Sequence, residues 1–250
     1  MQDLEALKED FQRDGFVHLC GFMSPVEMEE IEQYYQQVVH EVVPGLPKRD
    51  AMYEDYERPE TLKQVNVPEA DAPYFVELRK SAKMLGLAEG LLGEEVVPQS
   101  LELFIKPPGV GTPTPPHQDG FYFCLVPDQA LTLWLALDDM DNENGTLHYV
   151  AGSHKKGILS HRASRVLGFS QGLEEGDLAE FGREVACRLR RGDLLVHHSS
   201  TIHRAEGNPS SRLRRALAMV YYAKSAQVDP EAHRRYMESV DGQQREVGVR

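Results

Sequence analysis

The sequence predicts a mainly β protein in which N-terminal helices pack against a β-sandwich or barrel. The first hundred residues carry apolar side chains at helical spacing. From about residue 101, short runs that alternate between apolar and polar side chains are separated by glycine, proline and asparagine. Helices followed by about seven such runs form the element pattern of helices that cover a β-core.

The clearest helix signal is a capping box, Ser24-Pro25-Val26-Glu27, with proline at the first helical position. Apolar residues then recur at helical spacing, at Ile31, Tyr35, Val38 and Val42. Residues 48–73 combine charge and proline without a period, so we predict a long loop there that carries substrate contacts. Residues 73–92 return to a helical pattern.

The clearest strand signal covers residues 131–137, where leucines occupy one face and Thr132, Trp134 and Ala136 occupy the other. Asn144-Gly145 is a turn dipeptide that precedes an apolar run. Further strands are predicted over residues 146–150, 184–189, 193–197 and 213–223.

The length of the chain fits one domain over residues 1–250. We expect a mainly helical part over residues 1–100 and the β-core over residues 101–225. Residues 155–182 are rich in glycine, serine and charge, and we predict that they form a lid.

Composition narrows the class of function. The chain carries 27 basic and 40 acidic residues and a net charge of −13, which disfavours binding to nucleic acid or to an anionic membrane. Its three cysteines form no CxxC pair, which argues against a disulfide framework and a thiolate zinc site. The sequence has neither a secretory signal pattern nor a long apolar run, so we expect a soluble cytoplasmic protein.

The sharpest local motif is Pro115-Pro116-His117-Gln118-Asp119. Residues two apart in a strand share a face, so His117 and Asp119 can reach one metal ion. His203 follows a later predicted strand and completes a set of two imidazoles and one carboxylate, the facial triad of non-haem iron(II) oxygenases. The three coordination positions left open suit a 2-oxo acid and dioxygen. The alternative is a turn that Asp119 caps and in which His117 packs.

A second motif lies in residues 212–221, where Arg212 and Arg214 share a face with the small residues Ala216 and Ala218. Two arginines above a floor of small side chains suit a buried carboxylate, which a guanidinium binds through two parallel hydrogen bonds. The alternative is a strand end whose arginines reach water.

Five segments in the same order resemble the phytanoyl-CoA dioxygenase family of iron(II)/2-oxoglutarate oxygenases. They are Phe11-Gln12-Arg13-Asp14-Gly15-Phe16-Val17 with Gly21-Phe22-Met23-Ser24, then Phe104-Ile105-Lys106-Pro107-Pro108, Asn144-Gly145-Thr146-Leu147, Gly152-Ser153-His154, and a distal block of Gly192-Asp193-Leu194, His198, His203 and Asn208. The resemblance covers most of the chain. It implies a double-stranded β-helix core, that is, a cupin-like jelly roll, packed against the N-terminal helices.

The resemblance also implies the site. His117, Asp119 and His203 are expected as the metal ligands and catalytic residues, with iron(II), 2-oxoglutarate and O2 as cofactor and co-substrates. Residues expected near 2-oxoglutarate are Arg214, with Arg212 a close second, then Trp134, for which core packing is the alternative, and Lys106.

Other positions near the motif are candidates for the substrate pocket. They are Phe121, Tyr122 and His198, although residues 121–123 equally fit a core strand, and His197 or His198 equally fits a hydrogen-bonded core histidine. Some relatives carry serine where this chain has Ala205, and halogenating relatives replace the carboxylate ligand. The presence of Asp119 therefore favours hydroxylation over halogenation.

The sequence therefore predicts an iron(II)- and 2-oxoglutarate-dependent dioxygenase that hydroxylates a small molecule and releases succinate and CO2. The alternatives are a catalytically silent jelly roll that binds a metal or small molecule, and a zinc hydrolase, for which the sequence identifies no general base. An acyl-CoA, an amino-acid derivative and another metabolite all remain open as substrates, with a small free metabolite preferred. The oligomeric state and the regiochemistry do not follow from the sequence.

Overall fold

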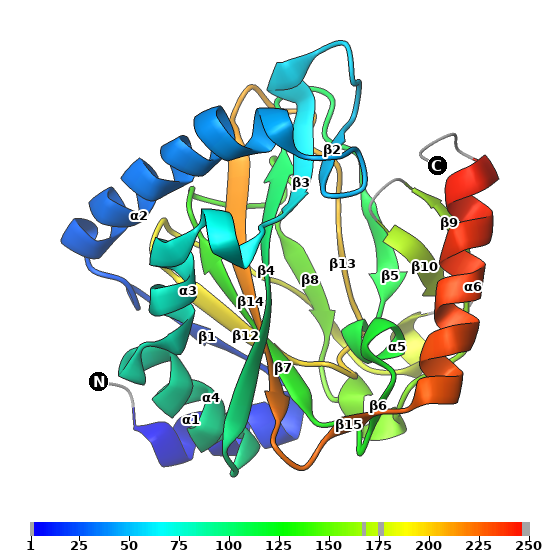
Figure 1. Cartoon of the computed structure of the whole chain (residues 1–250). Coiled ribbons are helices and arrows are strands. Elements are labelled where there is room, and N and C mark those ends of the chain that lie inside the picture. The colour runs from blue at the N-terminus through cyan, green and yellow to red at the C-terminus, as the bar shows by residue number, and fades with distance from the viewer. Residues whose placement is uncertain (1–2, 167–168, 175–177, 247–250) are drawn as a thin grey trace.

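Two antiparallel sheets form the core of the protein in a computed structural model that describes residues 3–166, 169–174 and 178–246 (Figure 1). The larger sheet has the strand order β1 (Phe16–Leu19), β12 (Leu194–His198), β7 (Ala130–Ala136), β14 (Arg214–Ala223), β4 (Val96–Lys106), β3 (Leu62–Asn66) and β2 (Ala51–Tyr53). The smaller sheet has the order β11 (Glu184–Ala186), β8 (Leu147–Val150), β13 (His203–Ala205) and β5 (Thr114–His117). Strands distant in sequence are neighbours in both sheets, which is the crossing connectivity of a jelly roll. The mainly β prediction with a jelly-roll core is confirmed, in its sandwich form.

Helices and short elements surround the sheets. The α-helices are α1 (Leu4–Asp14), α2 (Pro25–Gln37), α3 (Pro73–Lys80), α4 (Ala82–Leu92), α5 (Asp119–Phe123) and α6 (Pro230–Glu246). A π-helical turn covers Val38–Val42, and 3-10 turns cover Val43–Gly45, Pro59–Thr61, Glu69–Asp71, Ser153–Lys156 and Leu178–Glu180. Two-stranded pairs join β9 (His161–Val166) to β10 (Phe169–Leu173) and β6 (Leu125–Val126) to β15 (Gln227–Val228).

The alternation in β7 decides which face of the large sheet the helices cover. Leu131, Leu133 and Leu135 are fully buried in one core cluster with residues of α1 to α4, which lie together on one side of the sheet (Figure 1). Trp134 and Ala136 belong to a second cluster on the inner face. Both faces of β7 are therefore buried, and the small inner side chains leave room between the sheets.

The N-terminal helices form where their caps predict. In α2 the Ser24 hydroxyl accepts from the Glu27 amide at 3.3 Å, and the Glu27 carboxylate accepts from the Ser24 amide at 2.7 Å. The helical pattern over residues 73–92 forms two helices instead of one, because Ser81 leaves the helical conformation and its hydroxyl caps α4. Ser81 therefore ends α3 and begins α4.

The prediction of a long loop over residues 48–73 was wrong. Strands β2 and β3 lie there and extend the large sheet, with Ala51 opposite Val65. In β3 the apolar Leu62 is buried toward the helices, whereas Gln64 and Asn66 line a cavity. Polar residues on the inward face made this strand look like a loop in the sequence.

Two further regions differ from simple expectations. Helix α6 was not predicted, and it lies against α5 and β9 at the opposite side of the molecule from α1 to α4 (Figure 1). The predicted lid, residues 155–182, contains the β9–β10 hairpin, while residues 167–168 and 175–177 lie outside the described part. The lid function and the single-domain boundary stay predictions. Among the described residues, no helix is long and apolar enough to cross a membrane.

The buried leucine layer is expected to carry much of the stability. Leu217 is fully buried in the middle strand β14, so Leu217→Ala should lower the free energy of unfolding by about 2–5 kcal/mol, because it leaves a cavity in the core. Leu213, just before the same strand, is 37% exposed, and Leu213→Ala should change stability by less than about 0.5 kcal/mol. Urea unfolding followed by circular dichroism measures both, and equal losses would contradict this assignment of the core.

Candidate active site

Three side chains from β5, α5 and β13 converge at one end of the β5–β13 strand pair in the smaller sheet. His117 ends β5, Asp119 begins α5, and His203 begins β13, where it pairs directly with His117 across the two strands. Each imidazole Nε2 lies 3.6 Å from Asp119 Oδ1, and the three candidate ligand atoms lie within 4.8 Å of one another. The structure therefore brings the three predicted ligands together.

Backbone carbonyls orient both imidazoles. His117 Nδ1–H donates to the Pro115 carbonyl at 2.9 Å, and His203 Nδ1–H donates to the Thr201 carbonyl at 3.0 Å. These hydrogen bonds set the tautomer, so Nε2 is the atom that each ring presents for coordination. Burial lowers the pKa of both His117 and His203, which favours the neutral form that binds metals.

Gln118 lies between His117 and Asp119, and its side chain stabilises the turn that joins them. Its amide nitrogen donates to the carbonyls of Ser200 at 2.6 Å and Gly157 at 2.9 Å, and its amide oxygen accepts from the Leu159 amide at 2.8 Å. Gln118 is fully buried. The middle residue of the motif is thus a structural anchor, a role that the sequence pattern did not indicate.

Hydrogen bonds also hold the Asp119 carboxylate. Oδ2 accepts from the Thr132 hydroxyl at 2.9 Å and from His197 Nε2–H at 3.0 Å, while His197 Nδ1 accepts from the Tyr149 hydroxyl at 2.8 Å. Burial raises the pKa of Asp119, but the imidazoles of His203 and His197 outweigh it and lower the pKa overall. Asp119 is therefore an oriented carboxylate that directs Oδ1 at the other two ligands.

The donor set fits iron(II). Two neutral imidazoles and one carboxylate on a single face match the ligand types and geometry of the facial triad and leave the opposite face for other ligands. Another cluster, His18, Cys20 and Asp193, is also close enough to hold a metal ion. Its Asp193 carboxylate already accepts hydrogen bonds from the backbone amides of Gly21 and Arg190, which is a structural role. None of the three residues lines the cavity described next.

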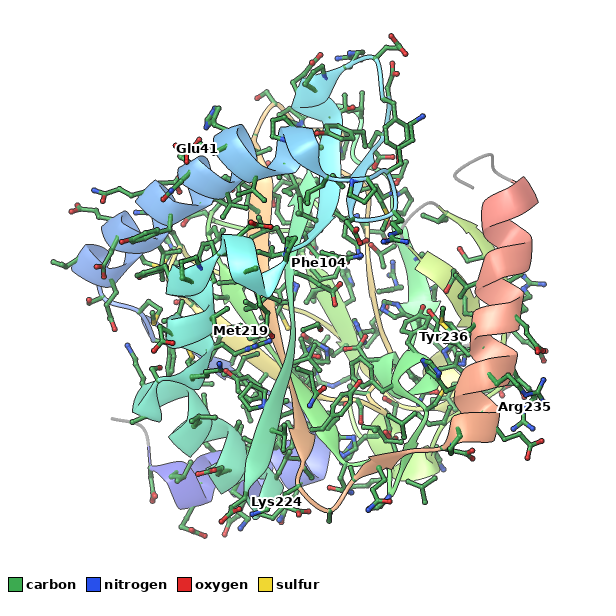
Figure 2. All side chains as sticks on the ribbon, in the orientation of Figure 1. Glu41, Phe104, Met219, Lys224, Arg235 and Tyr236 are labelled. Atoms are coloured by element: carbon green, nitrogen blue, oxygen red, sulfur yellow. The ribbon has the colours of Figure 1, made fainter. Side chains whose placement is uncertain are left out.

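A cavity of about 370 Å³ lies between the sheets and contains the triad. Its volume is near the lower end of the roughly 300–1,000 Å³ of small-molecule sites. Residues of β3, β4, β7 and β14 line one side, and residues of the smaller sheet line the other. Figure 2 shows Phe104 on β4 and Tyr236 on α6, and both side chains line the cavity.

Arg214 is the most unusual cation in this cavity. It is 3% exposed, and among the described residues its Nε and Nη1 have no hydrogen-bond partner. Its guanidinium carbon lies 5.4 Å from the centre of the Trp134 ring, and burial lowers its pKa to about 9. A buried guanidinium without a carboxylate is unfavourable, so this corner fits the carboxylate of a bound acid such as 2-oxoglutarate.

Lys106 lies opposite Arg214 in the β4–β14 register but does not line the cavity. Its ammonium donates to the Thr112 carbonyl and lies 3.5 Å from the Thr114 hydroxyl. Burial, followed by the charge of Arg214, lowers the pKa of Lys106 to about 6. Lys106 therefore packs beside Arg214 outside the cavity. Its predicted direct role toward 2-oxoglutarate stays a prediction.

The profile of the family described as "Phytanoyl-CoA dioxygenase (PhyH)" matches residues 11–216. The chain belongs to the phytanoyl-CoA dioxygenase family. Among curated relatives, "Phytanoyl-CoA dioxygenase" of Arabidopsis thaliana is 32% identical over 59% of this chain and 52% of its own length. The "Probable alpha-ketoglutarate-dependent hypophosphite dioxygenase" of Stutzerimonas stutzeri is 25% identical over 88% of this chain and 78% of its own length. The match spans about half the length of the plant relatives.

Solved structures of similar proteins agree with this family. EvdO2 of Micromonospora carbonacea var. aurantiaca complexed with 2-oxoglutarate is 27% identical with a TM-score of 0.71, covering 92% of this chain and 94% of that one. The epimerase SnoN in complex with Fe3+, alpha ketoglutarate and nogalamycin RO is 26% identical with a TM-score of 0.70, covering 91% and 86%. Together with the His-Asp-His cluster, these findings support a requirement for iron(II), 2-oxoglutarate and O2.

Arg212, expected near 2-oxoglutarate, and His198, expected in the substrate pocket, both lie outside the cavity. Arg212 precedes β14, so the strand alternation does not extend to it, and its guanidinium binds the Asp141 carboxylate at 2.7 Å near solvent. His198 faces away from its neighbour His197, accepts from the Ser200 amide at 3.1 Å, and does not line the cavity. These placements argue against the predicted roles of both residues.

Of the remaining pocket candidates, some line the cavity and one does not. Tyr122 and Trp134 line the cavity, and the Tyr122 hydroxyl donates to the Gln171 carbonyl at 2.6 Å. Phe121 does not line it, because its ring stacks on His161 with 4.2 Å between ring centres. Sequence reasoning missed Gln64, Glu102 and several other lining residues, since nothing in a single strand pattern separates a polar cavity face from a solvated one.

His197 is expected to act on metal affinity through Asp119. His197→Ala removes the hydrogen bond that orients the carboxylate, so iron(II) should bind about 10–100-fold more weakly. His198→Ala is the matched control and should leave the affinity unchanged, because this ring does not contact the ligands. Anaerobic titration with iron(II) against a chelator measures both, and equal affinities in the two variants would contradict the role of His197.

Proposed function

We propose that this protein is an iron(II)- and 2-oxoglutarate-dependent dioxygenase that hydroxylates a small-molecule substrate and releases succinate and CO2. One observation carries the proposal: the His117–Asp119–His203 cluster lines the same cavity as Arg214, whose Nε and Nη1 have no hydrogen-bond partner among the described residues. The family and the similar structures support oxygenase activity that depends on iron and 2-oxoglutarate. Similar structures also include the epimerase SnoN and the carbocyclase SnoK, so hydroxylation is the finer part of this proposal.

The residues divide the work between two ends of the cavity. Bound iron(II), with 2-oxoglutarate and O2, supplies the oxidising power for a C–H bond. His117, Asp119 and His203 would hold the metal on one face. Arg214 would bind the distal carboxylate of 2-oxoglutarate through two hydrogen bonds, with Trp134 packed beside it.

The other walls would orient the substrate and exclude water. Tyr122 and Phe123 of α5 and Tyr236 of α6 line the cavity. Aromatic walls position an apolar substrate body and keep bulk water from the reacting centre. The Tyr122 hydrogen bond to the Gln171 carbonyl joins α5 to the β9–β10 hairpin, which supports the proposed covering role of that hairpin.

A direct test is anaerobic titration of the metal-free protein with iron(II) and 2-oxoglutarate, monitored by the weak visible charge-transfer absorption of the chelate. We expect the band in the wild type and its loss in His117→Ala. If the wild type binds iron(II) and 2-oxoglutarate without forming the chelate, the oxygenase proposal fails and a catalytically silent binding protein becomes the better account.

Asp119→Ala is expected to abolish turnover. The change removes one ligand and one negative charge that neutralises the metal, so succinate production from 2-oxoglutarate should fall to background. Thermal unfolding of the variant checks that the fold persists. Succinate production at the wild-type rate in this variant would disprove the ligand assignment.

Arg214→Ala is expected to raise the apparent requirement for 2-oxoglutarate by about tenfold or more, because a buried charge-assisted pair contributes about 1.5–3 kcal/mol. Arg212→Ala is the matched control, since Arg212 already binds Asp141 near solvent and should leave the requirement unchanged. Titration of the charge-transfer band with 2-oxoglutarate measures both. The reverse outcome would transfer the role to Arg212.

A small-molecule partner is part of this proposal. The expectation of no nucleic-acid or membrane partner stays a prediction that rests on the net charge of −13. The cytoplasmic location stays a prediction that rests on the sequence pattern.

A further inference from the structure

The wall of the cavity formed by β3 and β4 carries the hydrogen-bond acceptors of Glu102 and Gln64. Glu102 on β4 lies opposite Asn66 of β3 on one side and Ala218 of β14 on the other. Gln64, two residues before Asn66, also lines the cavity. Strand β4 is two strands from β7, whose Thr132 holds Asp119, so this wall is roughly 10 Å across the sheet from the strand that carries Thr132.

The orientation of Gln64 leaves an acceptor without a donor. Its amide nitrogen donates to the Glu102 carboxylate at 3.2 Å, which fixes the amide oxygen at the other position. Gln64 is 6% exposed, and its Oε1 is buried with no hydrogen-bond partner among the described residues. Buried acceptors of this kind are rare in folded proteins, and Gln64 lines the cavity, so we take Oε1 as an acceptor that a ligand donor would satisfy.

Glu102 lacks a counter-ion. It accepts from Gln64 and from the Ser100 hydroxyl at 3.1 Å, and within the described part of the chain no cationic side chain lies at ion-pair distance from it. Two carboxylate oxygens accept about four hydrogen bonds, so acceptor capacity remains. Burial, and then the charge of Asp119, raises the pKa of Glu102 to about 7, which a bound cation would reverse.

These groups select the chemistry of what binds. The carboxylates of 2-oxoglutarate are repelled by Glu102, so this wall serves another molecule. A hydroxyl group has one hydrogen to donate, whereas an ammonium has three and carries the charge that a desolvated carboxylate needs. The nearby aromatic walls of Phe123 and Tyr236 also favour a cation beside an apolar body.

Two cationic side chains at the outer part of the cavity disfavour a ligand with several positive charges. Lys48 and Arg49 line the outer part of the cavity and are exposed. The Lys48 ammonium lies 4.6 Å from the centre of the Tyr56 ring, and Arg49 pairs with Asp50 at 3.4 Å. Two cations at the entrance repel a polyamine and tolerate a neutral or anionic outer end.

We propose that Glu102 and Gln64 Oε1 bind the amine of the substrate, which is a small molecule with one primary or secondary amine, an apolar body and a neutral or anionic outer end. This inference rests on the proposed oxygenase function, because it assigns the substrate side of the same cavity. It narrows the substrate class to small amines, amino-acid derivatives included, and makes Glu102 a specificity-determining residue.

The test uses the protein loaded with iron(II) and 2-oxoglutarate without oxygen, and calorimetric titration with paired probes. The pairs are phenethylamine with 2-phenylethanol, and cyclohexylamine with cyclohexanol, which differ in the amine alone. We expect at least one amine to bind the wild type about tenfold or more tightly than its alcohol. In Glu102→Gln that amine should lose about tenfold in affinity, while its alcohol changes less than about twofold.

Two further variants keep the test decisive. Glu29→Gln makes the same chemical change at an exposed carboxylate and should bind like the wild type. Gln64→Met removes the unpartnered acceptor at similar size, and it replaces Glu102→Gln as the diagnostic variant if the latter fails to fold. In either case thermal unfolding reports whether the variant is folded.

The outcomes separate this inference from the proposed function. A wild type that forms no charge-transfer band with iron(II) and 2-oxoglutarate refutes the oxygenase proposal itself. If the band forms, three results would each overturn the amine assignment alone: no amine binds, each amine binds no better than its alcohol, or the preference survives in Glu102→Gln and Gln64→Met.

Discussion

The antiparallel pairing of β5 with β13 is the constraint on which the candidate site depends. It sets His117 directly opposite His203, with 4.1 Å between the ring centres, although the two residues are far apart in the sequence. The chain leaves β5 immediately after His117, and the buried amide of Gln118 fixes the turn that brings Asp119 to the same point. A one-residue slip in this pairing would turn one imidazole to the other face of the sheet. The metal site is therefore a consequence of strand register.

The large sheet allows the cavity to be polar. Its outer face packs leucines of β7 and β14 against the N-terminal helices, and its inner face carries small or polar residues. Burying apolar surface on one face stabilises the fold enough to keep unfavourable groups on the other, such as the buried guanidinium of Arg214. Strands whose two faces differ in this way let one sheet serve both stability and binding.

The sequence predicted the features that depend on residues close together in the chain, and it did not predict those that depend on contacts between distant segments. The alternation in residues 131–137 correctly separated the leucine face from the face of Thr132 and Trp134, because strand periodicity is a local property. The two-residue spacing of His117 and Asp119 was local as well, but the turn after β5 brings them together, and the predicted shared strand face does not. The jelly-roll connectivity came from the family resemblance, since periodicity does not specify which strands pair.

The errors arose where the partner lay in another segment. Arg212 and Arg214 share a pattern in sequence, but only Arg214 lies within β14, and the Asp141 carboxylate draws Arg212 toward solvent. Residues 48–73 looked like a loop because β3 presents Gln64 and Asn66 to a cavity, and a polar inward face has the same composition as a solvated one. His197 and His198 are adjacent and chemically identical, and only the position of Asp119 distinguishes them.

The same two strands carry Arg214 and Glu102, whose charges form no ion pair within the described part of the chain. Arg214 lies opposite Lys106, and Glu102 lies opposite Ala218, so the two charged residues are offset by four positions along β4 and β14, roughly 13 Å. An ion pair forms only within about 4 Å, so neither group satisfies the other. Each is unfavourable without a partner of opposite charge, which a ligand would supply. The offset of four positions along one strand pair therefore separates the proposed acid site at Arg214 from the proposed amine site at Glu102, while His117 and His203 lie on the facing sheet.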